Sequence, residues 1–144
     1  MAVNRVKYEN CVVKKAVITS NASGDTVDLR KCLEVQYEES LFSDSSEVSF
    51  IIANRAGTIN GLTLAEGLPL VGTEDFELQI QDERENIIEV NLNVNKVIPI
   101  KKDTQQEQIG LALTSEEFIR NEERSSAVVK RYDGKVSKHI SDIL

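Results

Sequence analysis

The sequence predicts a mainly β fold, an antiparallel β-barrel with one or two short flanking α-helices, and two observations lead to it. Between Leu68 and Leu113 there are three runs in which apolar and polar residues alternate. Period-two alternation places successive side chains on opposite faces of a strand, so each run has one dry face and one wet face. Aromatic residues are few, with four Phe, three Tyr and no Trp. The core is therefore left to Val, Ile and Leu, which pack well on a pleated surface.

The three runs predict an antiparallel meander of half-buried strands. Their dry faces consist of Phe76, Leu78 and Ile80, of Ile88, Val90, Leu92 and Val94, and of Ile109, Leu111 and Leu113. The wet faces of the first two runs carry polar or acidic side chains and no Lys or Arg: Glu77, Gln79, Gln81, Glu89, Asn91, Asn93 and Asn95. Pro99, after the second run, indicates an edge position or an irregularity, because proline cannot donate to a strand ladder.

Alternation also predicts strands before the meander, at residues 12–19, 32–39 and 47–54. Residues 26–29 form either a brief strand or the exit of a turn. In the first strand, Val13, Lys15 and Val17 oppose Lys14, Ala16 and Ile18, and in the second Leu33, Val35 and Tyr37 point inward. The stretches 20–25 and 43–46 are rich in Ser, Asn, Asp and Gly, which favour turns.

Residues 55–73 form a long segment punctuated by four glycines and Pro69. Its apolar anchors are Ile59, Leu62, Leu64 and Leu68. Loops this long without structure of their own are uncommon in compact domains and are often functional. A short helix at residues 61–65 is compatible with this composition.

Period two ends at Thr114, and the chain after it reads as helical. Thr114 followed by Glu117 fits a capping box, which predicts a short helix containing Phe118 and Ile119. Residues 125–132 are compatible with a strand. Residues 135–144 are predicted to be helical, with Asp133 as a cap and one apolar stripe formed by Val136, Ile140, Ile143 and Leu144. Because the stripe reaches the last residue, we expect either that the chain is a fragment or that this helix docks on a partner.

Charge and cysteine content narrow the class of protein. The net charge of −7, with basic residues scattered in pairs, argues against a surface that tracks nucleic-acid phosphates. Cys11 and Cys32 are too few for a disulfide scaffold and predict reduced thiols in a cytosolic product. The N-terminus lacks the apolar core of a signal peptide, and apolar runs such as residues 50–53 are far shorter than a membrane span. We expect a soluble protein that is not secreted.

Chemistry-bearing motifs are missing from the sequence. His139 is the only histidine and has no Asp or Cys at ligand spacing. Adjacent carboxylates, such as Glu116 and Glu117, do not face each other on a helix or a strand. The glycines of residues 57–72 match no phosphate-binding pattern, and no zinc-protease, EF-hand or paired-cysteine motif occurs. The sequence thus predicts no enzyme, no cofactor and no metal site.

The order of segments follows a recognisable pattern along nearly the whole chain. A strand at residues 12–19 precedes one at 32–40, and Glu39-Ser-Leu-Phe42 leads to the strand at 47–54. A glycine-rich excursion then reaches Leu68-Pro-Leu-Val-Gly-Thr-Glu74 and Phe76-Glu-Leu-Gln-Ile80. Long paired strands and Leu113-Thr-Ser-Glu-Glu-Phe118 follow, and residues 129–144 look like an exit toward a next domain. This order resembles the N-terminal tube domain of the central baseplate hub protein of contractile-tailed phages.

The resemblance implies a β-barrel of the tail-tube kind with a helix at its flank. Hub proteins of this family form trimers in which each subunit supplies two barrels, so that a pseudo-sixfold ring joins the tail tube to the central spike. This chain is too short to contain a second barrel. It is therefore either the first part of a longer hub protein, in a trimer, or a shorter relative that forms a ring with more copies, such as a hexamer.

From the resemblance we expect a structural protein of the virion. Its partners are further copies in a ring, the tail-tube and spike proteins and other baseplate proteins, without specific nucleic-acid binding or a membrane, and it is assembled in the host cytoplasm. The chain divides into an N-terminal arm (1–11), a tail-tube-like barrel (12–124) and a C-terminal segment with an amphipathic helix (125–144).

Two sets of candidate residues go with this role. The wet-face residues Glu77, Gln79, Gln81, Glu89, Asn91, Asn93 and Asn95 are candidates for a pore lining, since a conduit wall without Lys or Arg does not hold DNA by counterion release. An ordinary solvated outer face is the alternative. Candidates for a subunit interface are Ile59, Leu62, Leu64, Ile140, Ile143 and Leu144. The competing function is a monomeric β-barrel or sandwich that binds a small ligand or peptide.

Overall fold

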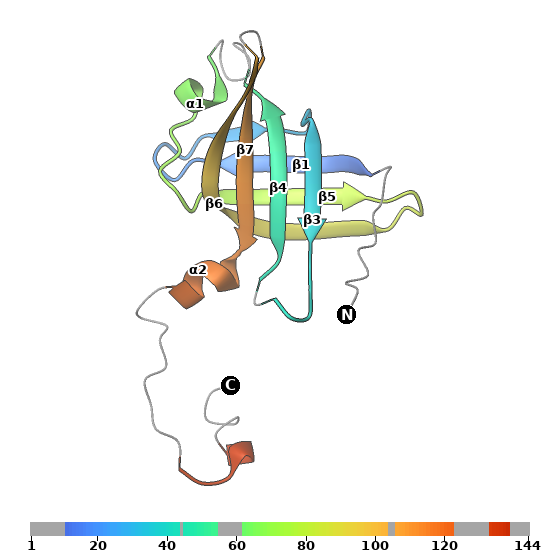
Figure 1. Cartoon of the computed structure of the whole chain (residues 1–144), viewed down its shortest axis with the longest axis vertical. Coiled ribbons are helices and arrows are strands. Elements are labelled where there is room, and N and C mark those ends of the chain that lie inside the picture. The colour runs from blue at the N-terminus through green and yellow to red at the C-terminus, as the bar shows by residue number, and fades with distance from the viewer. Residues whose placement is uncertain (1–10, 44, 55–61, 104–105, 123–132, 139–144) are drawn as a thin grey trace.

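The computed structural model of the chain describes residues 11–43, 45–54, 62–103, 106–122 and 133–138 (Figure 1). The predicted mainly β fold, antiparallel with two short helices, is confirmed. The strands are β1 (Val12–Thr19), β2 (Thr26–Asp28), β3 (Glu34–Glu38), β4 (Glu47–Ala53), β5 (Asp75–Gln81), β6 (Ile87–Asp103) and β7 (Gln106–Ser115). The helices are α1 (Leu64–Gly67) and α2 (Glu116–Glu122).

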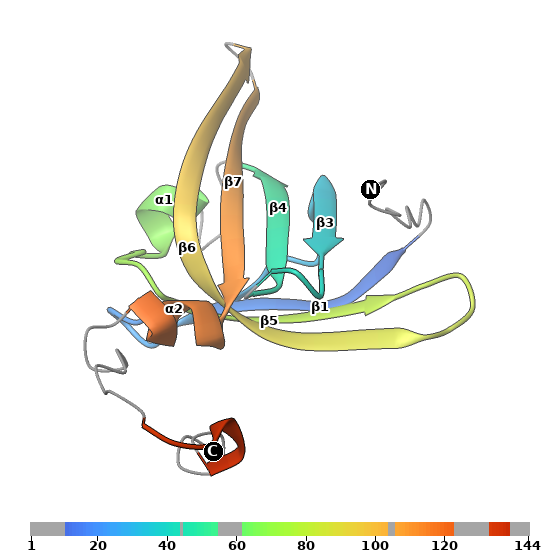
Figure 2. The same cartoon turned by 60° about the horizontal axis from the view of Figure 1, so that its bottom comes forward.

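All seven strands belong to one antiparallel sheet with the order β2-β1-β5-β6-β7-β4-β3. β6 is 17 residues long and pairs with β5 through its first part and with β7 through its second part. A bulge at Asn95 separates the two parts, and bulges bend a strand and increase its twist. The sheet therefore folds over on itself at β6 into two layers, one containing β1 and β5 and the other β7, β4 and β3 (Figure 2). Within the described residues β2 and β3 are the two edge strands of the sheet, and the second part of β6 is unpaired on its β5 side.

The core lies between the two layers and follows the predicted dry faces. Its buried members are Ala16, Ile18, Leu29, Val48, Phe50, Ile52, Leu64, Leu68, Phe76, Leu78, Ile80, Leu92, Val94, Ile109, Leu111 and Leu113. Of the residues predicted to be dry, Ile88 is 41% exposed and Val90 is half-buried. The reason is that the β5–β6 hairpin runs out beyond the edge of the other layer (Figure 2).

β1 has the predicted bounds, but the prediction put Val13 on the wrong face of the strand. The register between β1 and β5 shifts between Val13 and Lys15. The bulge at Lys14 turns Val13 to the core side, where it packs against the same cluster as Ala16 and Ile18. A single inserted residue reverses the alternation of a strand. In the region predicted as the second strand, β3 begins only at Glu34, and Leu33, predicted to point inward, is 55% exposed.

Helix capping also differs from the expectation. Thr114, the predicted cap, is buried in β7, where it pairs with Glu47. The α2 helix begins after Ser115, and Ser115 rather than Thr114 makes a side-chain hydrogen bond to Glu117. A complete capping box occurs instead on α1, where the Thr63 side chain accepts from Glu66 N and the Glu66 side chain accepts from Thr63 N. This box stabilises a helix of only one turn.

The far half of β6 was not predicted as a strand. Residues 95–103 lie beyond the part of β6 that pairs with β5, so among the described residues this half of β6 is paired on one side only, with β7. Pro99 sits there opposite Ile109, which confirms its edge position, because a proline on a free edge removes no ladder bond. The predicted strand at 125–132 and most of the predicted C-terminal helix lie outside the described residues. Val136, which is described, lies in a short helical stretch and is 71% exposed.

Candidate functional site

The layer formed by β1, β5 and the first part of β6 presents a mainly polar face to solvent, which apolar residues such as Val17 and Ile87 interrupt. In register, Glu77 lies opposite Asn91, and Gln79 lies opposite Glu89. Gln81 and Asn93 have the same parity as these residues on their own strands, so six of the seven candidate pore residues share one face. We call Glu77, Gln79, Gln81, Glu89, Asn91 and Asn93 the polar face. Whether this face lines a pore or is an ordinary solvated outer face stays a prediction.

β1 adds a positive charge to the polar face that the β5 and β6 sequences do not contain. Lys15 lies opposite Gln79 and forms an ion pair with Glu77. The hydrogen bond that Lys15 Nζ donates to Glu77, the charge of Glu77 and the charge of Glu89 raise the pKa of Lys15 above its ordinary value. Asp75, at the start of β5, accepts a hydrogen bond from Asn93 Nδ2 at 3.0 Å. Lys14, at the bulge of β1, is exposed as well, so this side of the layer carries two lysines against the carboxylates of Asp75, Glu77 and Glu89 and keeps an acidic excess.

Asn95, the seventh candidate, follows the part of β6 that pairs with β5. It lies at the bulge between Val94 and Lys96, next to β7. There it lines a shallow hollow of about 280 Å³ on the outer side of the second layer. The other lining residues are Gln36, Glu38, Glu47, Val48, Ser49, Ala112, Leu113, Thr114 and Phe118. Asn95 is thus exposed beside β7 and not beside β5, and its assignment to a pore lining stays a prediction.

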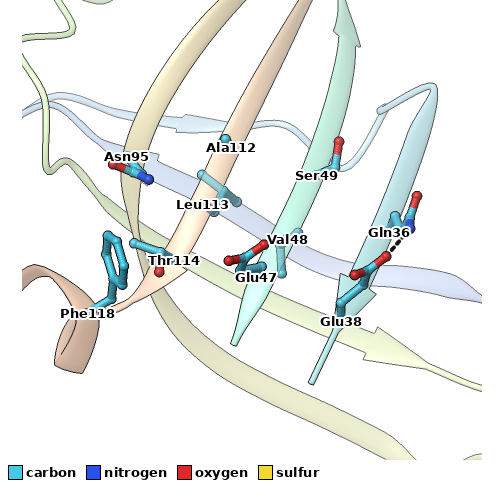
Figure 3. Close-up of a pocket in the computed structure, with 10 residues that line it drawn as sticks. All are labelled: Gln36, Glu38, Glu47, Val48, Ser49, Asn95, Ala112, Leu113, Thr114 and Phe118. Carbon is cyan, nitrogen blue, oxygen red and sulfur yellow. Dashed lines mark hydrogen bonds between the residues drawn. The ribbon is translucent and has the colours of Figure 1, made fainter. Parts of the chain in front are cut away.

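The hollow is open to solvent and mostly polar at its rim. Figure 3 shows Phe118 of α2 standing at one side of it and the carboxylates of Glu38 and Glu47 at the other. Gln36 donates a hydrogen bond to Glu38 across the surface of β3. Sites for small molecules are usually concave cavities of about 300–1,000 Å³ that bury most of the ligand. This hollow is smaller and more open than such sites.

The candidate interface residues are only partly described. Ile59, Ile140, Ile143 and Leu144 lie outside the described residues. Leu62 is 47% exposed and is therefore available for contact. Leu64 is fully buried in the chain's own core. The prediction for Leu64 was wrong because α1 turns this residue inward, so that the segment packs on the core between the two layers of the sheet.

Glu74, which the sequence did not predict as a site residue, has no exposed surface. Its Oε1 accepts hydrogen bonds from the backbone N–H groups of Val71 and of Gly72, the latter at 2.8 Å. Its Oε2 is buried and has no hydrogen-bond partner among the described residues. The carboxylate holds a turn in which Gly72 (φ 107°) and Thr73 (φ 59°) both adopt the left-handed region. Gly72 is the sequence signal for this turn, because glycine adopts a positive φ without steric cost.

A second missed feature is the turn between β3 and β4. Leu41 is 100% exposed and Phe42 is 96% exposed. The sequence signal was available, since two large apolar residues stand side by side between polar residues that form a turn. We call Leu41 and Phe42 the apolar tip.

The described parts of the chain contain no group of three or more His, Cys, Asp and Glu side chains arranged to hold a metal ion. Cys11 is exposed and Cys32 is half-buried, and both are free thiols. Burial raises the pKa of Cys32, which disfavours the reactive thiolate. His139 lies outside the described residues. No helix in the described ranges is long and apolar enough to cross a membrane.

Comparison of the chain with protein-family models, with curated proteins and with solved structures gave no match.

Proposed function

We propose that the chain is a structural component of a ring in the baseplate hub or tail tube of a contractile-tailed phage. In this role it links the tail tube to the central spike and contributes to the wall of the DNA conduit. The observation that carries the proposal is the polar face, because three strands place their polar side chains on one surface in register. The resemblance in segment order points to the assembly, a ring around a DNA conduit, in which such a surface lines the channel.

The charge of the polar face suits a conduit. The carboxylates of Asp75, Glu77 and Glu89 outnumber the two lysines on the layer formed by β1, β5 and β6, and Lys15 is engaged by Glu77. A wall with clustered free Lys or Arg would bind the phosphate backbone by releasing counterions and would retard the DNA. An acidic wall repels the phosphates, so DNA passes through without being held.

The test is imaging of purified full-length protein by electron microscopy, combined with a label on the polar face. In a Cys11→Ser, Cys32→Ser background, Asn91→Cys is coupled to a small maleimide-gold particle. The expected result is rings with a central hole and gold density at the hole. Rings with gold on their outer rim would contradict the part of the proposal that places the polar face on the pore wall. A strictly monomeric protein at all concentrations would overturn the ring altogether.

The alternative function, a module that binds an extended peptide, is favoured by one observation. β3 is a free edge of the sheet, and an exposed edge can accept a further strand from a peptide. Glu34 and Glu38 lie exposed on β3, and charges on an edge strand oppose such pairing. A monomeric particle whose β3 amides become protected from hydrogen exchange by a peptide would support this alternative.

A further inference from the structure

The apolar tip is an ordered feature. Ser43 N donates to Ser40 O at 3.1 Å, and Phe42 N donates to Ser40 Oγ at 3.2 Å, so the turn is held by its own hydrogen bonds. It presents Leu41 and Phe42 to water almost without cover. Adjacent large apolar side chains that are exposed together mark a contact with a partner more often than isolated ones do.

The surroundings of the apolar tip are acidic. The stretch from Tyr37 to Glu47 contains no Lys or Arg, and its four acidic residues are Glu38, Glu39, Asp44 and Glu47. Anionic lipid surfaces and nucleic-acid phosphates would be repelled by this charge. The chemistry that fits is an apolar protein surface with lysine beside it.

The chain itself carries such a surface on the outer side of β4, β7 and β6. Ile51, Gly110 and Ile98 form one row across the three strands. Ile98 is 41% exposed, Ile51 and Ile100 are half-buried, and a Cβ on Gly110 would lie 3.2 Å from Cδ1 of Ile100. The glycine thus lets Ile100 lie flat over β7. We call Ile51, Ile98 and Ile100 the hairpin patch.

Lysine adjoins the hairpin patch. Lys96 is exposed and occupies the next position on the same face of β6, opposite Ala112. Lys101 and Lys102 follow in the same strand. The β6–β7 hairpin therefore combines an apolar surface with lysine, whereas the acidic turn between β3 and β4 has no Lys or Arg.

The two surfaces cannot meet within one copy. The apolar tip lies at the end of the sheet where β4 begins, and the β6–β7 hairpin projects from the opposite end (Figure 1). Along β4, the four residue-to-residue steps from Glu47 to Ile51 alone span about 13 Å at ~3.3 Å per step. A contact between different patches at opposite ends of a subunit is heterologous, and it generates a closed ring when the rotation per subunit closes.

We propose that the apolar tip of one copy docks on the hairpin patch of a second copy, with Lys96 beside the glutamates that flank the tip. The inference rests on the proposed function and deepens it by naming the two surfaces that join neighbouring subunits. The occupant of the hairpin patch is thus a segment of the chain itself.

The experiment uses two full-length variants that disable one surface each. The tip variant carries Leu41→Ser and Phe42→Ser, and the patch variant carries Ile98→Asp, which places a negative charge where the acidic turn would dock. Val71→Ser is the matched control, because Val71 is 71% exposed and belongs to neither surface. Circular dichroism verifies that each variant is folded. Sedimentation velocity and native mass spectrometry, with one variant isotopically labelled, measure the assemblies.

The expected result is that each variant alone self-associates at least about tenfold more weakly than the unmodified chain, while Val71→Ser assembles normally. An equal mixture then forms one-to-one dimers, because each pair still has one intact tip and one intact patch. Loss of assembly in both variants without dimers in the mixture would overturn the pairing.

Other outcomes separate this inference from the proposed function. Rings that persist in both variants would overturn the inference and leave the ring standing. Open filaments that both variants abolish would support the contact and overturn the ring. Absence of any assembly of the unmodified chain would overturn both.

Discussion

Phe50 of β4 and Phe76 of β5 meet edge to face, with ring centroids 5.1 Å apart and an interplanar angle of 64°. Neither ring has any exposed surface. The two strands are not neighbours in the sheet, since β6 and β7 lie between them. This ring contact is therefore where the two layers of the folded sheet hold each other, and aromatic pairs in this geometry add attraction beyond the area they bury.

Replacement of Phe76 by Ala should cost about 4 kcal/mol of unfolding free energy, because it removes a buried ring and leaves a cavity between the layers. Urea denaturation measures the loss. Phe118→Ala is the control, since Phe118 is only half-buried at the edge of the hollow and should cost about 1 kcal/mol. Equal losses for the two variants would show that Phe76 does not join the layers.

The buried carboxylate of Glu74 should stabilise the turn before β5. In Glu74→Ala, the N–H groups of Val71 and Gly72 lose their acceptor, and we expect a loss of about 3 kcal/mol. Glu74→Gln keeps one acceptor oxygen and should lose less. Hydrogen exchange at the amides of Val71 and Gly72 should accelerate strongly in the Ala variant only. Similar exchange rates in both variants would contradict the role of the carboxylate.

Period two was sufficient to predict most of the strands and the buried faces of β4, β5 and β7, because each of these strands has one face against a single core. It failed wherever a register shift intervened. The bulge at Lys14 reversed Val13, and the bulge at Asn95 shifts the register of the rest of β6 against β7. Neither bulge contains a glycine, the residue that often marks a bulge in a sequence, so alternation alone cannot locate them.

The candidate site was predictable only in part, for a related reason. The polar face could be predicted residue by residue from β5 and β6, but not the ion pair to Lys15, which depends on β1 being the next strand. Strand order is a long-range property that periodicity does not report. The burial of Leu64 and Glu74 likewise depends on how the loop folds back on the core.

Stability should depend on pH through the β5–β6 hairpin. Asp82 accepts 2.8 Å hydrogen bonds from Arg84 N, Asn86 N and Asn86 Nδ2. The hydrogen bonds from Asn86 are the main cause that lowers the pKa of Asp82 below its ordinary value of 3.8. A lowered folded-state pKa gives stability that is fully present above the ordinary value and is lost as the pH falls through the folded value.

The measurement is the urea midpoint of the unmodified chain and of Asp82→Asn from pH 7 down to pH 2.5. We expect the unmodified chain to be more stable at neutral pH, and the difference to close below about pH 4. Glu117 also has a lowered pKa, from hydrogen bonds with its own backbone and with Ser115. The comparison isolates Asp82, because both proteins retain Glu117. A difference that stays constant with pH would exclude Asp82 as the titrating group.

Glu85 is the position where the chain can be stabilised most simply. It adopts φ 63° in the turn between β5 and β6, a left-handed conformation that costs most residues with a side chain about 1 kcal/mol and glycine almost nothing. The turn is already closed by hydrogen bonds from Asp82 N to Asn86 O and from Glu85 N to Asp82 O, which a glycine retains. Glu85→Gly should therefore raise the unfolding free energy by about 0.5–1 kcal/mol. Arg84→Gly, one residue earlier and without a positive φ, should lower it, since there glycine only adds freedom to the unfolded chain. Loss of stability in both variants would mean that the left-handed turn is not kept in solution.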